Sequence, residues 1–413
     1  MTHVSWHEPR DHGDLGDLMR SDGLLRTGGL PRPDGRAPTD GRAPAWLPTG
    51  GGRKPDGVES TLAAEDAEAI SLEAPSFAEI LEYEPKDLTI TVGAGTRLDA
   101  LKETLDAEGQ WLPPGESGAA RSVGGLVGAA QPGPFDAAFG SVRRHVLAVR
   151  TLAWDGRALA WGRAVVKNVA GYDMVGLWCG SRGRLGIVTA ASLRVWPQPV
   201  RREWLEFRES GEGWTLLDSL CSLEPAQDFR PDALFWHSGP GEGASAVAGF
   251  LGSEAAVRTR ADRSGEWASG LGFGIAKRTA PDQPFGAGRD GAEEVTRSVD
   301  RVVVRVACPR TELAELGRRL STVLADRTAE FTALPEAGRI TVSFTRPADP
   351  KPAAALRAAL FQAASERPIT VEAGGTAELA AAKARRTPEV ISVEGAVVDA
   401  LGGRPRHWLA DYV

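Results

Sequence analysis

The sequence predicts an α+β fold in two parts, and three observations lead to that prediction. The chain has 413 residues, of which 42% are hydrophobic and 25% charged. This is the composition of a globular protein, with enough length for two or three domains. Three glycine-rich clusters lie before residue 190, and strand-like and helix-like segments alternate after residue 200. We therefore expect a glycine-rich domain, followed by a smaller domain with helices on one face of an antiparallel sheet.

Residues 1–45 are expected to be a flexible segment. They contain a near-repeat, PDGRAP (Pro33–Pro38) followed by TDGRAP (Thr39–Pro44). A stretch so rich in glycine, proline and arginine buries too little apolar surface to offset the entropy lost on ordering. His3, His7 and His12 precede the repeat. No acidic or cysteine ligand stands at a set spacing beside them, so a solvated tail is favoured over a metal site.

In residues 46–200, the first regular elements follow a strand–turn–helix pattern. Asp87–Val92 (DLTITV) is rich in β-branched residues and predicts a strand. The segment Leu98–Leu105 carries leucines at helical spacing. Thr96 is the expected N-cap of this helix, and Gly109 marks its end.

Three further strands are predicted before residue 200, and the first two form a hairpin. Val146–Trp154 and Arg157–Gly162 flank the dipeptide Asp155-Gly156, which is the strongest short signal for a β-hairpin. Gly186–Trp196 predicts another strand, which Pro197 would end because proline lacks a backbone donor.

We place a domain boundary near residue 200, so that residues 201–413 form the second domain. The strand-like segments there are REWLEF, DALFWHS, RVVVRVAC and RITVSF, and the helix-like segments are WTLLDSLCSL, RTELAELGRRLSTVLADR and KPAAALRAALFQAAS. Their alternation predicts a small antiparallel sheet with helices on one face. The last forty residues carry weak signals, and no element is predicted in them.

Composition excludes several classes of function. A net charge of −7 gives no basic footprint for nucleic acid. No stretch approaches the roughly 18 apolar residues of a membrane span, and the N-terminus lacks a secretory signal. We expect a cytoplasmic protein that reaches a membrane only through a partner. Cys179, Cys221 and Cys308 lack C-x-x-C spacing, so they cannot fill a four-cysteine zinc or iron–sulfur site, and no metal site is expected.

Common nucleotide and hydrolase motifs are also missing. The turn Gly93-Ala94-Gly95 lies between a predicted strand and a predicted helix, as in a dinucleotide-binding fingerprint. The third glycine of that fingerprint is replaced by Leu98. No lysine is followed by serine or threonine, which excludes a P-loop, and no G-x-S-x-G elbow occurs.

The three glycine clusters remain as the main signal of a ligand site. They span Leu47–Gly57, Pro113–Ala130 and Lys167–Thr189. Successive glycines let main-chain N–H groups converge on an anion without a Cβ in the way. For any one cluster alone, an ordinary tight turn is the favoured explanation. Together they predict a phosphate-bearing cofactor, because a pyrophosphate needs such amides from two loops at once.

The order of these clusters resembles the vanillyl-alcohol-oxidase/PCMH-type superfamily of FAD proteins, and within it the FAD-binding (E) subunits of bacterial glycolate oxidases. The resemblance covers roughly residues 45–200 and rests on Tyr83–Leu101, GQWLPPG (Gly109–Gly115), SVGGLV (Ser122–Val127), Phe139–Gly156, GRAVVKNVAGYDM and GSRGRLGIVTAASLRV. VVKNVAGYD is specific to that subunit type. The resemblance implies a PCMH-type two-lobed FAD-binding domain over residues 46–200 and an α+β cap over residues 201–413.

The resemblance also implies roles for individual residues. The pyrophosphate loop would contain Gly50, Gly51, Gly52, Arg53 and Lys54. Pro114, Gly115, Ser122, Gly124 and Gly125 would border the other side of the pyrophosphate and the flavin ring. Gly186, Ile187 and Val188 would lie along the adenine. Lys167, Asn168, Tyr172 and Asp173 would sit near the flavin, although a surface turn with a structural tyrosine explains them too.

Two absences bear on the chemistry. Many relatives tether FAD through a histidine at the position of Arg53 or a cysteine in the second loop, and this chain has neither, so non-covalent FAD is expected. The GHxGDGNxH motif of related D-2-hydroxyacid dehydrogenases is also missing. His237 and His407 stand alone after residue 200, and the sequence identifies no catalytic base.

The expected function is the FAD-binding subunit of a glycolate oxidase or dehydrogenase, which oxidises glycolate to glyoxylate. Its partners would be a second flavin subunit and an iron–sulfur subunit. The alternatives are a self-sufficient FAD-dependent oxidoreductase of another 2-hydroxyacid or alcohol, and a non-catalytic assembly subunit that carries flavin.

Overall fold

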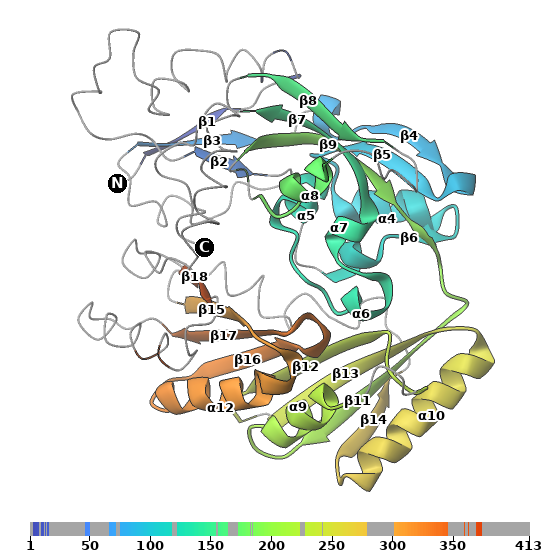
Figure 1. Ribbon diagram of the computed structural model, residues 1–413, viewed down its shortest axis with the longest axis vertical. Helices are drawn as coiled ribbons and strands as arrows, with labels where there is room; N and C mark the ends of the chain where they lie inside the picture. The colour runs from blue at the N-terminus through green and yellow to red at the C-terminus, as the bar shows by residue number, and fades with distance from the viewer. Residues whose placement is uncertain are drawn as a thin grey trace.

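The computed structural model describes residues 3–7, 10–11, 13, 15, 46–49, 66–71, 75–117, 122–153, 156–163, 172–181, 183, 185–223, 228–241, 243–278, 301–345, 359, 362 and 369–373. Strands β1 to β10 lie in an N-terminal half (residues 3–197), and strands β11 to β18 lie in a C-terminal half (residues 201–373), as Figure 1 shows. The α+β class is confirmed, because helices and antiparallel sheets occur in both halves.

A three-stranded parallel sheet begins the N-terminal half. It contains β1 (His3–His7), β2 (Trp46–Thr49) and β3 (Asp66–Ser71), in the order β1-β3-β2. His3 and His7 therefore belong to a strand that pairs with β3. His12 and residues 16–45 lie outside the described residues. The first glycine cluster begins in β2, and its residues 50–57, which follow this strand in the chain, lie outside the described residues.

A five-stranded antiparallel sheet forms the rest of this half. Its order is β4 (Ile80–Glu84), β5 (Thr89–Gly93), β9 (Gly186–Arg194), β7 (Val146–Ala153) and β8 (Ala158–Gly162). Helices α4 (Leu98–Asp106), α5 (Val123–Ala129), α7 (Val142–His145) and α8 (Met174–Trp178) pack on one face around a common apolar core. Short segments β6 (Gln110–Trp111), β10 (Trp196–Pro197) and α6 (Asp136–Phe139) lie toward the C-terminal half.

The predicted elements of this half are present with small shifts. The strand expected at residue 87 starts at Thr89, because Asp87 closes a 3-10 turn and Leu88 takes a left-handed conformation. Leu98, Leu101 and Leu105 are buried on one face of α4 as predicted. The N-cap is Arg97 and not Thr96. β7 and β8 pair as the predicted hairpin.

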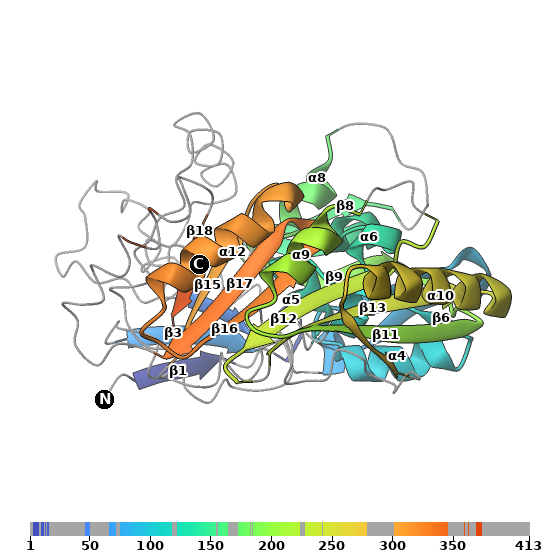
Figure 2. The same cartoon turned by 90° about the horizontal axis from the view of Figure 1, so that it is seen from below.

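The C-terminal half is built on an eight-stranded antiparallel sheet. Its order is β14 (Gly274–Arg278), β11 (Arg201–Glu209), β13 (Gly243–Gly252), β12 (Ala233–Gly239), β16 (Ala329–Leu334), β17 (Arg339–Thr345), β15 (Arg301–Ala307) and β18 (Ile369–Ala373). Helices α9 (Trp214–Cys221), α10 (Glu254–Gly270) and α12 (Leu313–Val323) cover the face that points away from the N-terminal half (Figure 2).

The sequence predicted the helix-covered antiparallel sheet but not its size. Five elements had no predicted counterpart, namely β13, α10, β14, β16 and β18. The helix predicted over residues 351–365 falls almost entirely outside the described residues. Pro197 does not stop regular structure, because it lies in β10 opposite Gln110.

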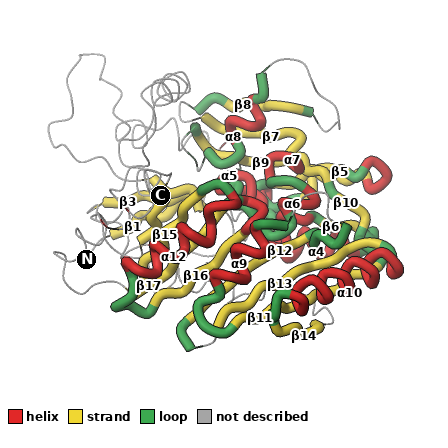
Figure 3. The backbone as a smooth tube through the Cα atoms, turned by 60° about the horizontal axis from the view of Figure 1, so that its bottom comes forward, coloured by secondary structure: helices red, strands yellow, loops and turns green. Residues whose placement is uncertain are grey.

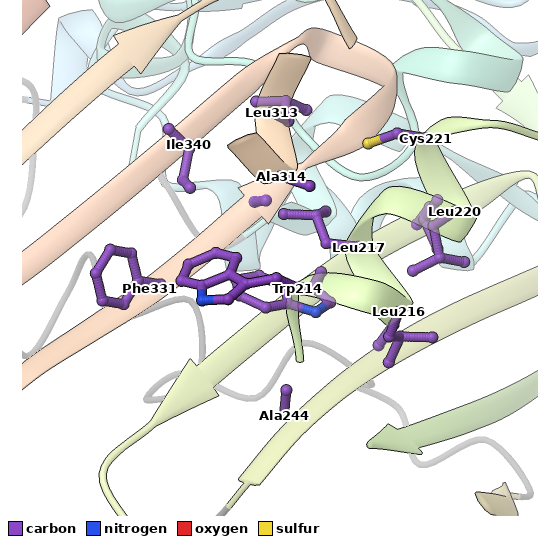
Figure 4. Close-up of a cluster of buried hydrophobic side chains, with 14 of the residues drawn as sticks. Trp214, Leu216, Leu217, Leu220, Cys221, Ala244, Leu313, Ala314, Phe331 and Ile340 are labelled. Atoms are coloured by element: carbon purple, nitrogen blue, oxygen red, sulfur yellow. The ribbon is translucent and has the colours of Figure 1, made fainter. Parts of the chain in front are cut away.

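An apolar cluster joins the helices to the outer face of the eight-stranded sheet. Trp214 lies at its centre, with ring centroids 5.1 Å from those of Trp236 and of Phe331. Figure 4 shows this ring among leucines of α9 and side chains of the sheet. Gly317 of α12 faces the same indole, since a Cβ at this position would lie 2.2 Å from a ring atom of Trp214. The glycine is required for close packing of the helix.

The two halves meet through aromatic side chains on the other, inner face of that sheet. Phe135, beside α6, makes edge contacts with Trp111 at 5.3 Å and with Trp204 of β11 at 6.1 Å between ring centroids. Arg202 stacks on Trp111 at 4.4 Å and pairs with Glu116 at 2.8 Å. Figure 3 shows α6 at this junction, next to β12. The inner face of the sheet therefore faces the N-terminal half.

Candidate functional site

The turn Gly93–Thr96 is the junction around which the N-terminal half is assembled. The N–H of Gly93 donates to Glu79 at 2.8 Å, that of Gly95 to Phe77 at 2.7 Å, and that of Ala94 to Thr189 at 2.9 Å. A Cβ on Gly93 would lie 2.1 Å from the carbonyl oxygen of Phe77. The turn that resembled a dinucleotide motif is thus held by packing, and its glycines allow close approach of main chains.

Helix α5 begins directly on this turn. The N–H of Val123 donates to the Thr96 carbonyl at 3.0 Å, and that of Gly124 to the Ala94 carbonyl at 2.7 Å. Ser122 caps the helix, because its Oγ accepts from the N–H of Gly125 at 3.2 Å. The first amides of α5 therefore have partners within the protein. Gly124 serves close packing, since a Cβ there would lie 3.0 Å from both Cβ and O of Ala94.

The surroundings of α5 fit a bound cofactor in two respects. Val123, Leu126 and Val127 point into the core, whereas a Cβ at Gly128 would meet no atom within 4 Å. One side of the helix thus carries backbone with open space beside it. The hydroxyl of Thr96, which is 4% exposed, has no hydrogen-bond partner. A buried hydroxyl without a partner is costly, and a polar ligand would satisfy it.

The second glycine loop places Pro114 and Gly115 next to the contact between the halves. Both lie in a 3-10 helix, Pro113–Ser117, and the N–H of Gly115 donates to Leu112 at 2.9 Å. Pro114 is buried and Gly115 half-buried. The next residue, Glu116, makes the ion pair with Arg202 of β11. This loop therefore connects the expected cofactor site to the eight-stranded sheet.

Strand β9 begins with Gly186, Ile187 and Val188. These residues pair with β7 on one side, and their other side has no described partner strand. Gly186 lies opposite Ala153 and Val188 opposite Thr151. On the other side, β5 ends at Gly93, which pairs with Ala190. Residues 186–188 thus run past the last residue of β5, and no described strand pairs with that edge. A main-chain edge of this kind offers hydrogen bonds to a planar heterocycle such as adenine.

Tyr172 and Asp173 lie together at the start of α8. The Tyr172 side chain is 94% exposed. Asp173 caps α8 by accepting from Gly176 N–H at 2.9 Å, and it accepts from Nε of Arg143 at 3.1 Å. The hydrogen bond from Arg143 is the main cause that lowers the pKa of Asp173, with burial acting in the opposite direction. Asp173 therefore holds α8 against α7 in this structure.

Seven of the site residues named from the sequence lie outside the described residues: Gly50, Gly51, Gly52, Arg53, Lys54, Lys167 and Asn168. The first five belong to the loop between β2 and β3. Lys167 and Asn168 belong to the segment between β8 and α8. Of the others, the structure brings Ser122, Gly124 and Gly125 together on the turn at Gly93, with β9 alongside.

The junction between the halves also contains a perturbed carboxyl group. Burial raises the pKa of Asp136 to about 6, while a backbone hydrogen bond at Gly133 and the charge of Arg339 act to lower it. Arg339 of β17 donates to the Oε1 of Gln131 at 2.8 Å, which links the sheet to the segment after α5. Neither contact was predicted from the sequence.

The described part of the chain holds no group of three or more His, Cys, Asp or Glu side chains arranged to bind a metal. Cys179, Cys221 and Cys308 are free thiols. Burial raises the pKa of Cys179 to about 11 and that of Cys221 to about 12, so both stay protonated near neutral pH. No helix in the described ranges is long and apolar enough to cross a membrane.

Comparison with known proteins identifies the cofactor. Residues 42–162 match the family model described as "FAD binding domain". This segment is therefore similar in sequence to FAD-binding domains. FAD, the cofactor that the family resemblance implied, is confirmed. The match includes the loop after β2 and the start of α5, and it ends at the last residue of β8.

Relatives of known name match about a third of this chain. Glycolate oxidase subunit GlcE of Escherichia coli is 41% identical over 131 residues, which are 30% of this chain and 37% of that protein. D-lactate dehydrogenase of Archaeoglobus fulgidus is 30% identical over 33% of this chain and 30% of its own length. Glycolate oxidase subunit GlcD of Bacillus subtilis is 31% identical over 31% and 27%. The chain thus spans about a third of the length of these relatives.

Solved structures extend the likeness to the whole fold. Alkyldihydroxyacetonephosphate synthase superposes with a TM-score of 0.65 at 14% identity, covering 97% of this chain and 77% of that protein. At this identity the likeness concerns the fold. It supports the α+β architecture expected from the sequence.

Proposed function

We propose that the protein is an FAD-dependent oxidoreductase that oxidises a 2-hydroxyacid, and that its donor is glycolate, which becomes glyoxylate. The relatives named above include two glycolate oxidase subunits and a D-lactate dehydrogenase. Another relative is named D-2-hydroxyglutarate dehydrogenase. All these names refer to oxidation of a hydroxyl group next to a carboxylate. This shared chemistry supports the donor class, and the 41% identity to GlcE supports glycolate within it.

One structural observation carries the proposal. Helix α5, which begins at the turn Gly93–Thr96, leads to Gln131, and Gln131 accepts a hydrogen bond from Arg339 on the inner face of the eight-stranded sheet. FAD bound beside α5 would thus share a space with that face. We propose that residues 46–200 are the FAD-binding domain and residues 201–413 a cap that closes the donor site.

We propose a role for each of the cofactor-binding residues. Backbone amides of Gly50, Gly51 and Gly52 would hold the pyrophosphate, with Arg53 and Lys54 adding positive charge. Gly186, Ile187 and Val188 would offer a strand edge to the adenine. Gly124 and Ser122 would act indirectly, because their hydrogen bonds fix α5 on the turn. FAD supplies the hydride acceptor. We propose that it is non-covalent, since Arg53 replaces the tethering histidine.

We further propose that the protein works in a complex. Its partners would be a second flavin subunit and an iron–sulfur subunit, which take the electrons onward. The chain has three cysteines in all, too few to ligate a four-cysteine cluster of its own. We propose a cytoplasmic location, with contact to the inner membrane through these partners.

Purification of the native complex tests this proposal. It should contain FAD in this chain, a second flavoprotein and an iron–sulfur protein, and glycolate should reduce the FAD without added acceptor. A second donor class, D-lactate or D-2-hydroxyglutarate, is favoured by the other relatives. Faster reduction by either would change the donor but keep the reaction. Failure of all three donors in the intact complex would refute the function.

A further inference from the structure

Polar side chains cross the inner face of the eight-stranded sheet in a single row. Backbone pairing places Ser245 of β13 opposite His237 of β12, then Thr332 of β16, Thr341 of β17 and Arg305 of β15. Their sequence neighbours Trp236, Ala333, Ile340 and Val304 point to the outer face and are fully or almost fully buried there. The five members of the row are half-buried. Because they alternate with these buried neighbours, they lie on the face toward the FAD-binding domain.

Near one end of the row, next to Ser245, the side chains of His237 and Glu330 approach the same point. A Cβ on Gly239, two residues after His237 on the same face of β12, would lie 3.1 Å from Cε1 and 3.5 Å from Nε2 of His237. The same point lies 3.8 Å from Cγ of Glu330. The imidazole therefore leans along its strand toward Glu330, over backbone that has no side chain. Ser343 Oγ hydrogen-bonds Glu330 Oε2 at 3.4 Å and helps to hold the carboxylate.

Arg305, a positively charged residue, lies at the other end of the row. Arg305 pairs with Thr341, and Thr341 with Thr332, which pairs with His237. Three strand spacings separate His237 from Arg305, about 14 Å between their Cα atoms. Thr332 and Thr341 lie between these two residues on the same face of the sheet.

The row lies next to the contact with the FAD-binding domain. Arg339, which bonds Gln131 after α5, is two residues from Thr341 on the same face of β17. Two strand residues span about 6.6 Å. Phe235, in the aromatic cluster between the halves, is likewise two residues from His237. The row thus begins where the apolar contact between the halves ends.

We propose that this row is the donor site, with Arg305 binding the carboxylate and His237 accepting the hydroxyl proton of the 2-hydroxyacid. This assignment rests on the proposed function. In the reaction, the donor O–H bond breaks and its proton goes to Nε2 of His237. The Cα hydrogen leaves with two electrons for FAD, and the donor becomes a 2-oxoacid. Glu330 is a positioning residue, because its carboxylate orients the imidazole and stabilises it once protonated. Arginine suits the other end because its planar fork binds carboxylates bidentately.

The test separates binding from proton transfer in the full-length, FAD-loaded protein. Anaerobic stopped-flow measures flavin reduction by glycolate, D-lactate and D-2-hydroxyglutarate, and calorimetry measures binding of oxalate, which cannot be oxidised in this way. His237→Gln should slow reduction by about 10²–10⁴-fold and leave oxalate affinity within a few-fold of the parent. Glu330→Gln should slow reduction less. The parent rate should fall with decreasing pH as histidine takes up a proton, and His237→Gln should lose this dependence.

Arginine variants test the carboxylate end. Arg305→Gln should weaken oxalate binding by about 10- to 100-fold, since a charged hydrogen-bonding partner is lost, and Arg305→Lys should recover part of it. Arg318→Gln and Glu315→Gln are matched controls on the outer helix α12, where both side chains are exposed. They should behave as the parent. If Arg305→Gln does not fold, Thr341→Val takes its place, with a smaller expected loss.

The outcomes distinguish the site from the function. Parent-like flavin reduction and pH dependence in His237→Gln would overturn the assignment of the base while leaving the proposed function intact. Unchanged oxalate affinity in Arg305→Gln would overturn the carboxylate site. If no donor reduces the parent in its complex but oxalate binding depends on Arg305, the proposed function is refuted and the anion site stands.

Discussion

Replacing Gly317 by alanine should destabilise the cap, although glycine is normally the weaker residue inside a helix. Gly317 lies in the middle of α12. A Cβ there would lie 2.2 Å from Cζ3 of Trp214 and 2.8 Å from Cη2. The indole cannot simply move aside, because it packs against Trp236 and Phe331 and its Nε1 donates to Glu212 at 2.6 Å.

The magnitude follows from two opposing terms. Alanine gains about 1 kcal/mol of helix propensity over glycine. Overpacking a filled core costs about 1–3 kcal/mol, and a contact this short belongs at or above the upper end. The net loss should be about 2 kcal/mol. For a cap of roughly 200 residues, this lowers the melting temperature by about 4–8 °C.

A matched glycine in the same half provides the control. Gly265 lies inside α10, and a Cβ there would make an ordinary contact with Cδ1 of Ile275 at 3.7 Å. Gly265→Ala should therefore raise the melting temperature by about 2–4 °C. Differential scanning calorimetry of both variants and the parent measures the two shifts. If Gly317→Ala is as stable as Gly265→Ala, the packing of α12 on Trp214 is not as described.

Three further predictions concern the cofactor and the junction between the halves. Acid or heat denaturation should release all flavin into the supernatant, and flavin that stays with the precipitate would contradict non-covalent binding. Gly51→Asp and Gly124→Asp should both lose FAD, measured as flavin per protein. The first would block the approach of the phosphate, and the second would push α5 away from Ala94. Parent-like flavin content in either variant would contradict the role of that glycine. Asp136→Asn should stabilise the protein at pH 8 by about 3 kcal/mol in urea unfolding. Burial raises the pKa of Asp136 to about 6, so the parent loses stability as pH rises through 6, and the advantage of the variant should vanish near pH 4. A stability advantage that does not depend on pH would show that the carboxyl is not buried as described.

Local patterns in the sequence predicted much of the backbone. The β-branched run before Gly93, the leucines of α4 and the Asp155-Gly156 turn each correspond to an observed element, because these signals depend on neighbours in the chain. β13 and α10 had no such signal. GASAVAGFLG is built of small residues, and EAAVRTRADRSGEWASG has no continuous apolar stripe. Their formation depends on partners in the sheet.

Only those features of the site that lie within one segment of the sequence could be predicted. The glycine clusters indicated the cofactor. The N–H of Gly124, however, donates to the carbonyl of Ala94, so this amide is not available to a ligand. His237 looked isolated because Glu330 is distant in the sequence and lies near it only through the pairing of β12 with β16. No pattern within one segment could have shown that arrangement.

The central claim is that this chain binds FAD and uses it to oxidise a 2-hydroxyacid. The most direct measurement is an anaerobic spectrum of the FAD-loaded protein in its native complex, recorded before and after addition of glycolate. We expect the flavin absorption band to disappear, with one glyoxylate formed for each FAD reduced in this chain. A band that persists with glycolate, D-lactate and D-2-hydroxyglutarate, yet is bleached by dithionite, would contradict the account.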